Sequence, residues 1–508
     1  MNKTILIIFL TLATVIQAQT GMYYNVKDYG AKADGVTIDT KAIDATIDAA
    51  SKAGGGTVFF PAGTYLSFTI HLKSFITLNF DNGATLEAAD VEKNGLGYDA
   101  AEPNQFDMYQ DFGHSHFRNS LIYGENLQNI AITGLGTIYG NGLTREGHKT
   151  VGMANKAIAL KLCRNVVIKD ISILMGGHFA ILATGVDNLT LDNLKVDTNR
   201  DAFDIDCCRH VRVSNCSVNS PYDDAICLKS SYALGFARST EDVTITNCFV
   251  SGFDRKSFLN ATYKKDEAQT VPDKGVVTGR IKFGTESNGG FRNISISNCT
   301  FEFCRGLALE TVDGGILEDV SVDNIVMKDI LNAPFFLRLG ARMRGPEGTP
   351  VGIIRRINIS NVLAYSQNPK FCSMIMGIPG HPIEDVKLNN ILIRIKGGAP
   401  KEQALKVVGE HEKSYPDPQE FGDMPAYGFY IRHVKNIELS HVEMKLENDD
   451  FRPAIMVDDV SDASFNYVKA DKVGSIPTLY LRNARDVKIS NCKPLKDMQI
   501  KNAISLEF

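Results

Sequence analysis

Tryptophan is absent from the 508-residue sequence, and no block of basic residues occurs in it. Without tryptophan, any flat ligand ring has to stack on tyrosine or phenylalanine. The formal net charge of −5 is spread evenly along the chain, which disfavours nucleic acid as a partner. Ten cysteines in a chain of this length do not make a disulfide scaffold. After the first residues no apolar run reaches membrane-spanning length, so we expect no membrane anchor.

The first 18 residues have the pattern of a signal peptide. Lys3 gives a positive start, residues 5–16 are mostly apolar, and Ala18 is a small residue suited to cleavage. No cysteine lies near the cleavage point, so lipid attachment there is not expected. We therefore expect residues 19–508 to form an exported monomer, either periplasmic or extracellular.

A short phrase recurs along the chain: a polar residue, then apolar–x–apolar, then Asn, Asp or Gly. The closest copies begin 22 and 23 residues apart, and larger gaps fit one or two coils with an insertion. Short β-runs at this period predict an all-β fold of one domain, a single-stranded right-handed parallel β-helix. A leucine-rich repeat has a similar period, but its leucine and asparagine frame is missing. The copies begin at Asn129, Asn165, Asn188, His210, Asp242, Asn293, Asp319, Arg356, Asp385, Asn436 and Asp486.

Residues 38–53 precede the repeats and read as an amphipathic helix. Asp39 can cap its start, Ile43 and Ile47 lie on one face, and Gly54 ends it. We expect this helix to cover the open first coil of the solenoid. Strand-like alternation follows at residues 57–60 and 68–72.

Four polar insertions are too long for simple connections. Loops of this length beside a flat sheet usually form the walls of a cleft, although each can also be solvated decoration. They cover residues 90–120, 252–278, 341–351 and 397–427.

Three cysteines follow an asparagine at the same place in the repeat. We interpret Cys216, Cys248 and Cys299 as a stacked column of buried thiols, without bonding or chemistry.

Three carboxylates stand at the centre of the repeats. Asp201 precedes Asp223 and Asp224 by 22 and 23 residues, which is about one coil. Because adjacent strands lie roughly 4.8 Å apart, we expect these acids to stack on one sheet face. Crowded like charges cost stability and raise at least one pKa, which a fold tolerates mainly at a functional site. Such a cluster suits protonation of a leaving group and activation of a water.

A spacing of 23 residues fixes the expected register around these acids. It places His178 in one row with Asp201 and Asp224, where we expect the histidine to contact a ligand. The same spacing stacks three buried pairs, Ala180/Leu182, Phe203/Ile205 and Ile226/Leu228. Outward positions would form a charge ladder of Asp206, Lys229, Lys282 and Glu310, unless Lys229 only neutralises the acids.

Several motifs resemble glycoside hydrolase family 28, the polygalacturonases and their relatives. GAKADG and GGGTVFFPAGTY, within residues 26–65, and residues 121–142 look like segments of pectin-active β-helix enzymes. Asn199-Arg-Asp201 matches the family's Asn-x-Asp motif, and Asp223-Asp224 matches its Asp-Asp motif. The resemblance implies a pectin-lyase-like β-helix that hydrolyses an oligo- or polysaccharide with inversion, without metal or organic cofactor. It makes Asp223 the general acid, and Asp201 and Asp224 the residues that position and deprotonate the water.

Two family motifs are altered. The histidine of Gly-His-Gly is absent near residues 278–280, and Ala308-Leu309-Glu310 stands where Arg-x-Lys is expected. Arg280 and Lys282, one coil earlier, are expected to recognise charge instead. Glu310 is expected either to reject a carboxylate or to bind hydroxyls of a neutral sugar. The full set of expected substrate-binding residues is His178, Asn199, Lys229, Arg280, Lys282 and Glu310.

Four functions remain open at this stage. The preferred one is an exported, exo-acting glycosidase for galacturonic-acid-containing pectic glycans of the cell wall. A glycosidase for another, possibly neutral, sugar linkage is the first alternative. A polysaccharide lyase would use Arg280 as its base, and a binding or adhesion solenoid would use no acids. In the lyase, calcium would be held by Asp201, Asp204, Asp206, Asp223 and Asp224.

Overall fold

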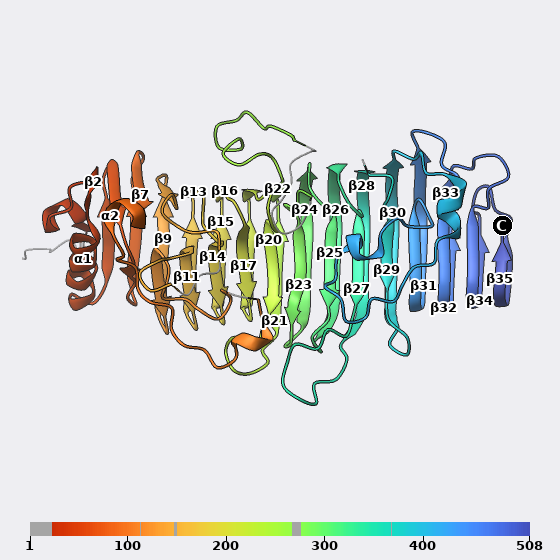
Figure 1. The fold of residues 1–508 in the computed structure, drawn as a ribbon, viewed down its shortest axis with the longest axis horizontal. Coiled ribbons are helices and arrows are strands. Elements are labelled where there is room, and N and C mark those ends of the chain that lie inside the picture. Colours follow the sequence, from red (N-terminus) through yellow and green to blue (C-terminus); the bar gives the residue numbers. More distant parts are fainter. Residues whose placement is uncertain (1–22, 112, 147–149, 267–275, 367) are drawn as a thin grey trace, which may run out of the picture.

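The computed structural model describes residues 23–508 except 112, 147–149, 267–275 and 367. Its strands join into one sheet that winds along a single long axis (Figure 1). Strands of successive coils pair in parallel as three ladders, which confirms the expected right-handed parallel β-helix. The expected signal peptide, residues 1–18, lies outside the described residues.

The first two ladders form the two faces of the helix that do not carry the acids. Their strands are short, and their apolar residues alternate between the core and the surface. The first ladder contains β1 (Tyr23–Asn25), β3 (Gly56–Phe60), β6 (Ile76–Phe80), β9 (Gln128–Gly134), β12 (Arg164–Lys169), β15 (Asp187–Asp192), β18 (Arg209–Ser214) and β21 (Thr240–Thr246). The second contains β2 (Asp34–Ile38), β4 (Gly63–Ser67), β7 (Ala84–Ala88), β10 (Thr137–Tyr139), β13 (Ser172–Leu174), β16 (Lys195–Asp197), β19 (Ser217–Asn219) and β22 (Phe249–Ser251).

The third ladder carries the acids. Its strands are buried on both faces near the middle of the molecule, where segments from outside the helix cover them. The ladder contains β5 (Ile70–His71), β8 (Ile122–Glu125), β11 (Lys156–Lys161), β14 (Phe179–Thr184), β17 (Asp201–Asp206), β20 (Ile226–Ser230), β23 (Ile281–Ser287), β25 (Leu307–Thr311), β27 (Phe335–Leu339) and β29 (Ser373–Met376).

Beyond the acids the strands lengthen and bend from one face to the next. For example, β31 (Phe429–Leu446) pairs with β29 through its first residues and with β30 (Ile383–Ile395) through the rest. The other long strands are β24 (Phe291–Glu302), β26 (Ile316–Ile330), β28 (Ile353–Ser366), β32 (Ile455–Asn466) and β34 (Leu479–Ser490), and a short β33 (Lys469–Ala470) pairs with β31.

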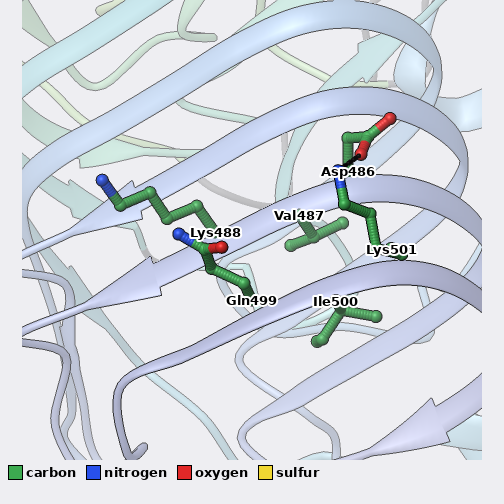
Figure 2. A pocket seen from close by; sticks show the side chains of 6 residues that line it. All are labelled: Asp486, Val487, Lys488, Gln499, Ile500 and Lys501. Atoms are coloured by element: carbon green, nitrogen blue, oxygen red, sulfur yellow. Dashed lines mark hydrogen bonds and ion pairs between the residues drawn. The ribbon is translucent and has the colours of Figure 1, made fainter.

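The C-terminal end is closed by β35 (Met498–Glu507), which pairs antiparallel to β34. A shallow hollow lies between these two strands, and Figure 2 shows Lys501 reaching across to Asp486, with Nζ 3.0 Å from Oδ1. Because the acids lie many coils away on β17 and beside β20, this hollow is not part of the candidate site.

The N-terminal end is covered by α1 (Thr40–Lys52), which confirms the expected helix. Ile43 and Ile47 are fully buried against the first coils. Asp39 is the N-cap residue, but its side chain accepts hydrogen bonds from the backbone of Lys32 and Ala33 instead of the helix. The remaining helices are short: η1 (Val26–Tyr29), α2 (Val91–Asn94), η2 (Asp107–Tyr109), η3 (Lys401–Leu405) and η4 (Pro418–Phe421). Within the described residues, none of the helices has the length and apolar character needed to cross a bilayer.

The first residue of every recurring phrase occupies a left-handed turn. All eleven have φ between 50° and 59°. Asparagine and aspartate tolerate this conformation better than most residues. Their side chains also connect coils, since Asn165 donates to Asn129 at 2.8 Å and Asn188 donates to Asn165 at 3.0 Å. The phrase is therefore the corner signal of each coil.

The three cysteines stack as expected. Cys216, Cys248 and Cys299 occupy equivalent positions on successive coils, and all are buried free thiols.

The expected register is correct on one side of Asp201 and wrong on the other. Phe203 faces Ile226, which preserves the spacing of 23 residues toward β20 and keeps Asp201 in line with Asp224. The spacing toward β14 is 22, so Asp201 faces Phe179 and not His178. The buried partners of Phe203 and Ile205 are consequently Ile181 and Ala183, in place of Ala180 and Leu182.

The expected charge ladder is also displaced by one row. Asp206 faces Lys229, but Lys282 faces Cys227 and Ala308. Glu310 instead faces Arg338 on the following coil. The displacement arises because the register shifts between β20 and β23.

The outward row of the third ladder changes character along the axis. It is apolar before β17 and again after β23, and both apolar stretches are covered. Phe117 packs on the first stretch, and Val408, Phe421 and Met424 pack on the second. Charged side chains therefore face outward on only three coils, which we call the polar window. The row reads Tyr123, Ala159, Leu182, then Asp204, Cys227, Lys282, then Ala308, Phe336, Met374, Tyr430.

Candidate active site

The three predicted catalytic acids meet at one edge of the polar window. Asp201 begins β17, and Asp223 and Asp224 immediately precede β20. One carboxylate oxygen from each lies within 4.8 Å of the others. The backbone N–H of Asp224 donates to Asp201 Oδ1 and to Asp223 Oδ1, both at 3.1 Å. Each side chain is at most 4% exposed, so the three charges interact where water screens them poorly.

Two of these acids have opposite electrostatic surroundings. Burial, together with Asp223 and Asp204, raises the pKa of Asp201 well above its usual value. Asp224 instead lies 3.0 Å from Arg280 Nε and 3.4 Å from Lys282 Nζ, and these cations stabilise its ionised form. The cluster therefore holds a proton near Asp201 and a negative charge on Asp224 at neutral pH.

Arg200 is a site residue that sequence reasoning missed. Its Nε lies 3.2 Å from Asp223 Oδ2, and its Nη1 lies 2.7 Å from His178 Nε2. His178 is buried, and its Nδ1 lies 2.8 Å from the carbonyl oxygen of Arg145. Burial and Arg200 lower the pKa of His178, so it is a neutral imidazole. The structure thus connects His178 to the acids through Arg200. A cation in the middle of the Asn-x-Asp motif was the available signal.

Glu310 lies on the far side of Arg280 and Lys282 from the acids' shared edge. Its oxygens are 3.9 Å from Arg280 Nη2 and 3.8 Å from Lys282 Nζ. The side chain is fully buried, and neither oxygen has a hydrogen-bond donor among the described residues. Burial raises the pKa of Glu310 to about 7, although Lys282 and Arg280 limit the rise.

Lys229 contacts acids on the other side of the polar window. Its Nζ is 3.0 Å from Glu286 Oε2 and 3.9 Å from Asp204 Oδ2. His114, from the insertion at residues 90–120, places Nε2 2.9 Å from the same Asp204 oxygen, in ion-pair contact without hydrogen-bond geometry. These contacts support the alternative in which Lys229 neutralises acids.

Asn199 lies beside Asp201 but makes no printed contact with the acids. It is 5% exposed, and its Oδ1 accepts a 3.4 Å hydrogen bond from the Thr198 hydroxyl. Its predicted role in substrate binding stays a prediction.

Insertions supply further site residues that no spacing rule could locate. Tyr415 accepts a 3.0 Å hydrogen bond from Lys282, whose Nζ also lies 5.1 Å from the centre of its ring. Asp417 forms an ion pair with Arg305 and lies 3.9 Å from Arg280 Nη2. Both residues come from the insertion at 397–427, which follows β29 in the sequence and crosses the sheet (Figure 1).

The carboxylates that a calcium-dependent lyase would use are not brought together as one ligand set. Asp201, Asp223 and Asp224 are close enough to share an ion. However, Arg280 and Lys282 already contact Asp224. Asp206 is also directed elsewhere, since it accepts hydrogen bonds from the backbone and hydroxyl of Ser231. The donor set does not fit the five-aspartate calcium site.

A buried acid–base cluster on a parallel β-helix defines a class of β-helix enzyme, and comparisons with known proteins narrow that class. Residues 23–175 match the family model "Rhamnogalacturonase A/epimerase, pectate lyase-like". A probable polygalacturonase of Vitis vinifera is 24% identical over 407 residues, covering 74% of each chain. An exo-poly-alpha-D-galacturonosidase of Dickeya chrysanthemi is 33% identical over 175 residues, which are 33% of this chain and 27% of that one.

Solved structures agree on the fold. The family 28 exopolygalacturonase of Yersinia enterocolitica superposes with a TM-score of 0.63 at 18% identity, covering 89% of this chain and 79% of that one. The chain is a polygalacturonase-like protein of the glycoside hydrolase class.

Proposed function

We propose that the chain is an exported glycosidase that hydrolyses α-linked, galacturonic-acid-containing pectic glycans from a chain end, with inversion. The observation that carries this proposal is the buried cluster of Asp201, Asp223 and Asp224 on adjacent coils. The substrate class follows the names of the relatives, and the proposed export follows residues 1–18.

The surroundings of each acid suggest its role. Asp224, held ionised by Arg280 and Lys282, is suited to take a proton from the attacking water. Asp223 donates a proton to the glycosidic oxygen, as the family motif implies. The proton stored near Asp201 is within the same cluster and can supply it. Arg200 stabilises Asp223 as a carboxylate again once the leaving group has taken that proton.

The two apolar covers support action at a chain end. Phe117 covers the outward row on one side of the polar window, and Phe421 with Met424 covers it on the other. The window spans three coils, roughly 10 Å between its outer strands. A long glycan laid along the helix axis would collide with both covers, whereas a terminal residue needs only the window.

Inversion is the least constrained part of the proposal. Inverting glycosidases usually separate the two carboxyl groups by roughly 6.5–9.5 Å, to leave room for a water. Here one oxygen of each acid lies within 4.8 Å of the others. Inversion therefore requires the water to lie against Asp201 and Asp224 on the side away from Asp223. The anomeric form of the first product, followed by proton NMR before mutarotation, decides this point.

Product analysis tests the proposed function. Wild type and Asp223→Asn are incubated with polygalacturonic acid and, separately, with a mixed rhamnogalacturonan digest. We expect saturated products released from chain ends by the wild type, and a loss of about 10²–10⁴-fold in rate for the variant, the range that a general acid contributes. Monomeric galacturonate from polygalacturonic acid would identify the galacturonidase activity.

Other outcomes have distinct meanings. Activity on the mixed substrate alone would favour the alternative, a glycosidase for a different linkage. An unsaturated product, or loss of activity with a chelator, would contradict hydrolysis and support a lyase. Release of long internal fragments would contradict exo action.

The proposed export has its own test. We expect the full-length gene product, expressed in a Gram-negative host, to be recovered outside the cytoplasm with a new N-terminus near Gln19. Retention of Met1 in a cytoplasmic product would contradict export.

A further inference from the structure

The side of the site beyond Asp224 is built from buried charges in contact with one another. Arg280 and Lys282 project from β23, and Glu310 projects from β25 on the next coil. Arg280 and Lys282 are 2% exposed, and Glu310 is fully buried. The half-buried Tyr415 lies against Lys282. Tyr415 is the most exposed of these residues, so an arriving sugar meets it first.

The positive charges of this region are already compensated. Lys282 contacts Asp224 at 3.4 Å and Glu310 at 3.8 Å, and Arg280 contacts the same two acids. Arg338 on β27 is directed at the backbone carbonyls of Gly377 and Glu410 and not at Glu310. Three cations therefore face three carboxyl groups: Arg280, Lys282 and Arg305 against Asp224, Asp417 and Glu310.

This balance matters for substrate charge. Binding a uronate carboxylate requires a cation whose charge is not already neutralised. A uronate placed against Lys282 would add a fourth negative charge to a buried cluster, and uncompensated buried charge is costly. A neutral ring adds no charge and has hydroxyl hydrogens to offer. Tyr415 supplies an aromatic face in a chain that lacks tryptophan.

We propose that the subsite formed by Tyr415, Lys282 and Glu310 takes a neutral sugar, and that Glu310 sets this preference by neutralising Lys282 and Arg280. The inference rests on the proposed function and specifies its substrate, a glycan in which galacturonic acid alternates with a neutral sugar. Glu310 acts through the two cations and is therefore a positioning residue.

The titration of Glu310 gives the preference a pH dependence. The groups that face it are Arg280 and Lys282 on β23, Asp224 before β20, Asp417 and Tyr415 from the insertion, and Arg338 on β27. Burial raises the pKa of Glu310 to about 7. Below that pH the carboxyl is neutral, which leaves one positive charge uncompensated and makes a uronate acceptable. Above it, the balance is restored and the uronate is disfavoured.

The test compares kcat/KM for two oligosaccharides of equal length, an oligogalacturonide and a rhamnogalacturonan oligosaccharide. We expect the wild-type preference for the mixed oligosaccharide to rise by about tenfold between pH 5.5 and 8.5. In Glu310→Gln we expect a ratio that does not change with pH and that favours the oligogalacturonide about tenfold more than the wild type does at pH 8.5. Effects of pH on the common catalytic acids cancel in the ratio.

Glu318→Gln is the matched control, because Glu318 is ion-paired with Arg355 and Arg356 on another face of the helix. We expect it to keep the wild-type ratio at every pH. If Glu310→Gln does not fold, the pH dependence of the wild-type ratio still decides. Hydrolysis of both substrates with a constant ratio would overturn this inference alone. Hydrolysis of neither would overturn the proposed function together with it.

Discussion

Asp201 and Asp224 lie one coil apart and yet have opposite surroundings. Asp224 has two cations within 3.4 Å, while Asp201 has burial and neighbouring carboxylates. The buried charge of Asp201 is therefore a cost to the folded protein, which is the usual trade between stability and activity at a catalytic site.

This cost predicts the behaviour of Asp201→Asn. Because the pKa of Asp201 is raised on folding, its favourable contribution is complete below the unfolded pKa of about 3.9 and is lost as pH rises through the folded value. We expect the variant to be more stable than wild type by about 1–3 kcal/mol at pH 8. That gain should shrink toward zero below about pH 4, while activity falls about 10²–10⁴-fold. Denaturant unfolding at several pH values measures the difference.

Asp192→Asn is the control with the opposite sign. Asp192 accepts hydrogen bonds from Ser214 and Asn215, which lower its pKa. Its contribution is present at neutral pH and is lost on acidification, so this variant should be less stable than wild type at pH 8. A stability gain for Asp192→Asn, or a loss for Asp201→Asn, would contradict the assigned surroundings.

The sequence located the acids but not their partners. Asp201, Asp223 and Asp224 follow from motifs at one-coil spacing, which the regular rise of strands converts into proximity. Tyr415 and Asp417 reach the site from an insertion whose path no periodic pattern specifies. Arg200 lay within a recognised motif, and its charge was a signal that the motif comparison did not use.

Helix α1 is attached to the body of the molecule by a titratable residue. His71 on β5 places Nδ1 3.1 Å from Asp44 on the helix and Nε2 2.8 Å from Asp99 on the insertion at residues 90–120. The hydrogen bond to Asp44, opposed by burial and supported by Asp99, raises the pKa of His71 to about 9. The element that covers the first coil is therefore held most firmly while His71 is charged.

We expect His71→Gln to lower the Tm, with the full effect below about pH 6.5 and none well above pH 9, because a raised histidine pKa stabilises only while the group is protonated. The side chain is 45% exposed, so solvent screening limits the effect to under about 1 kcal/mol. Thermal unfolding between pH 6 and 10 measures it. His381→Gln, at an exposed turn, should show no such trend. An effect of His71→Gln that is independent of pH would mean that packing, and not charge, holds the helix.

The repeat phrase predicted the coils because it marks their corners. Asn, Asp and His at these positions adopt left-handed conformations that few other residues tolerate, so their spacing counts coils reliably. The same count failed to give the register at β14, where the coil is one residue shorter. A slip of one residue moved His178 out of the row of Asp201, since strand side chains alternate between faces.

Taken as a whole, the molecule is a long solenoid with a short functional region. Apolar segments cover the third ladder on both sides of the polar window, so most of the helix supports the site without forming it. The three coils between the covers hold the crowded acids and the compensated cations. This arrangement is the basis of the proposed hydrolysis of a chain end.

Hydrolysis at this cluster is tested most directly by digesting both pectic substrates in water enriched in oxygen-18. We expect wild-type products to carry one heavy oxygen at the new reducing end, at a rate above the slow exchange seen without enzyme. We also expect Asp201→Asn, Asp223→Asn and Asp224→Asn each to reduce that incorporation to the level without enzyme, while Glu318→Gln keeps it. Cleavage without heavy oxygen, or undiminished incorporation by the three variants, would contradict the account.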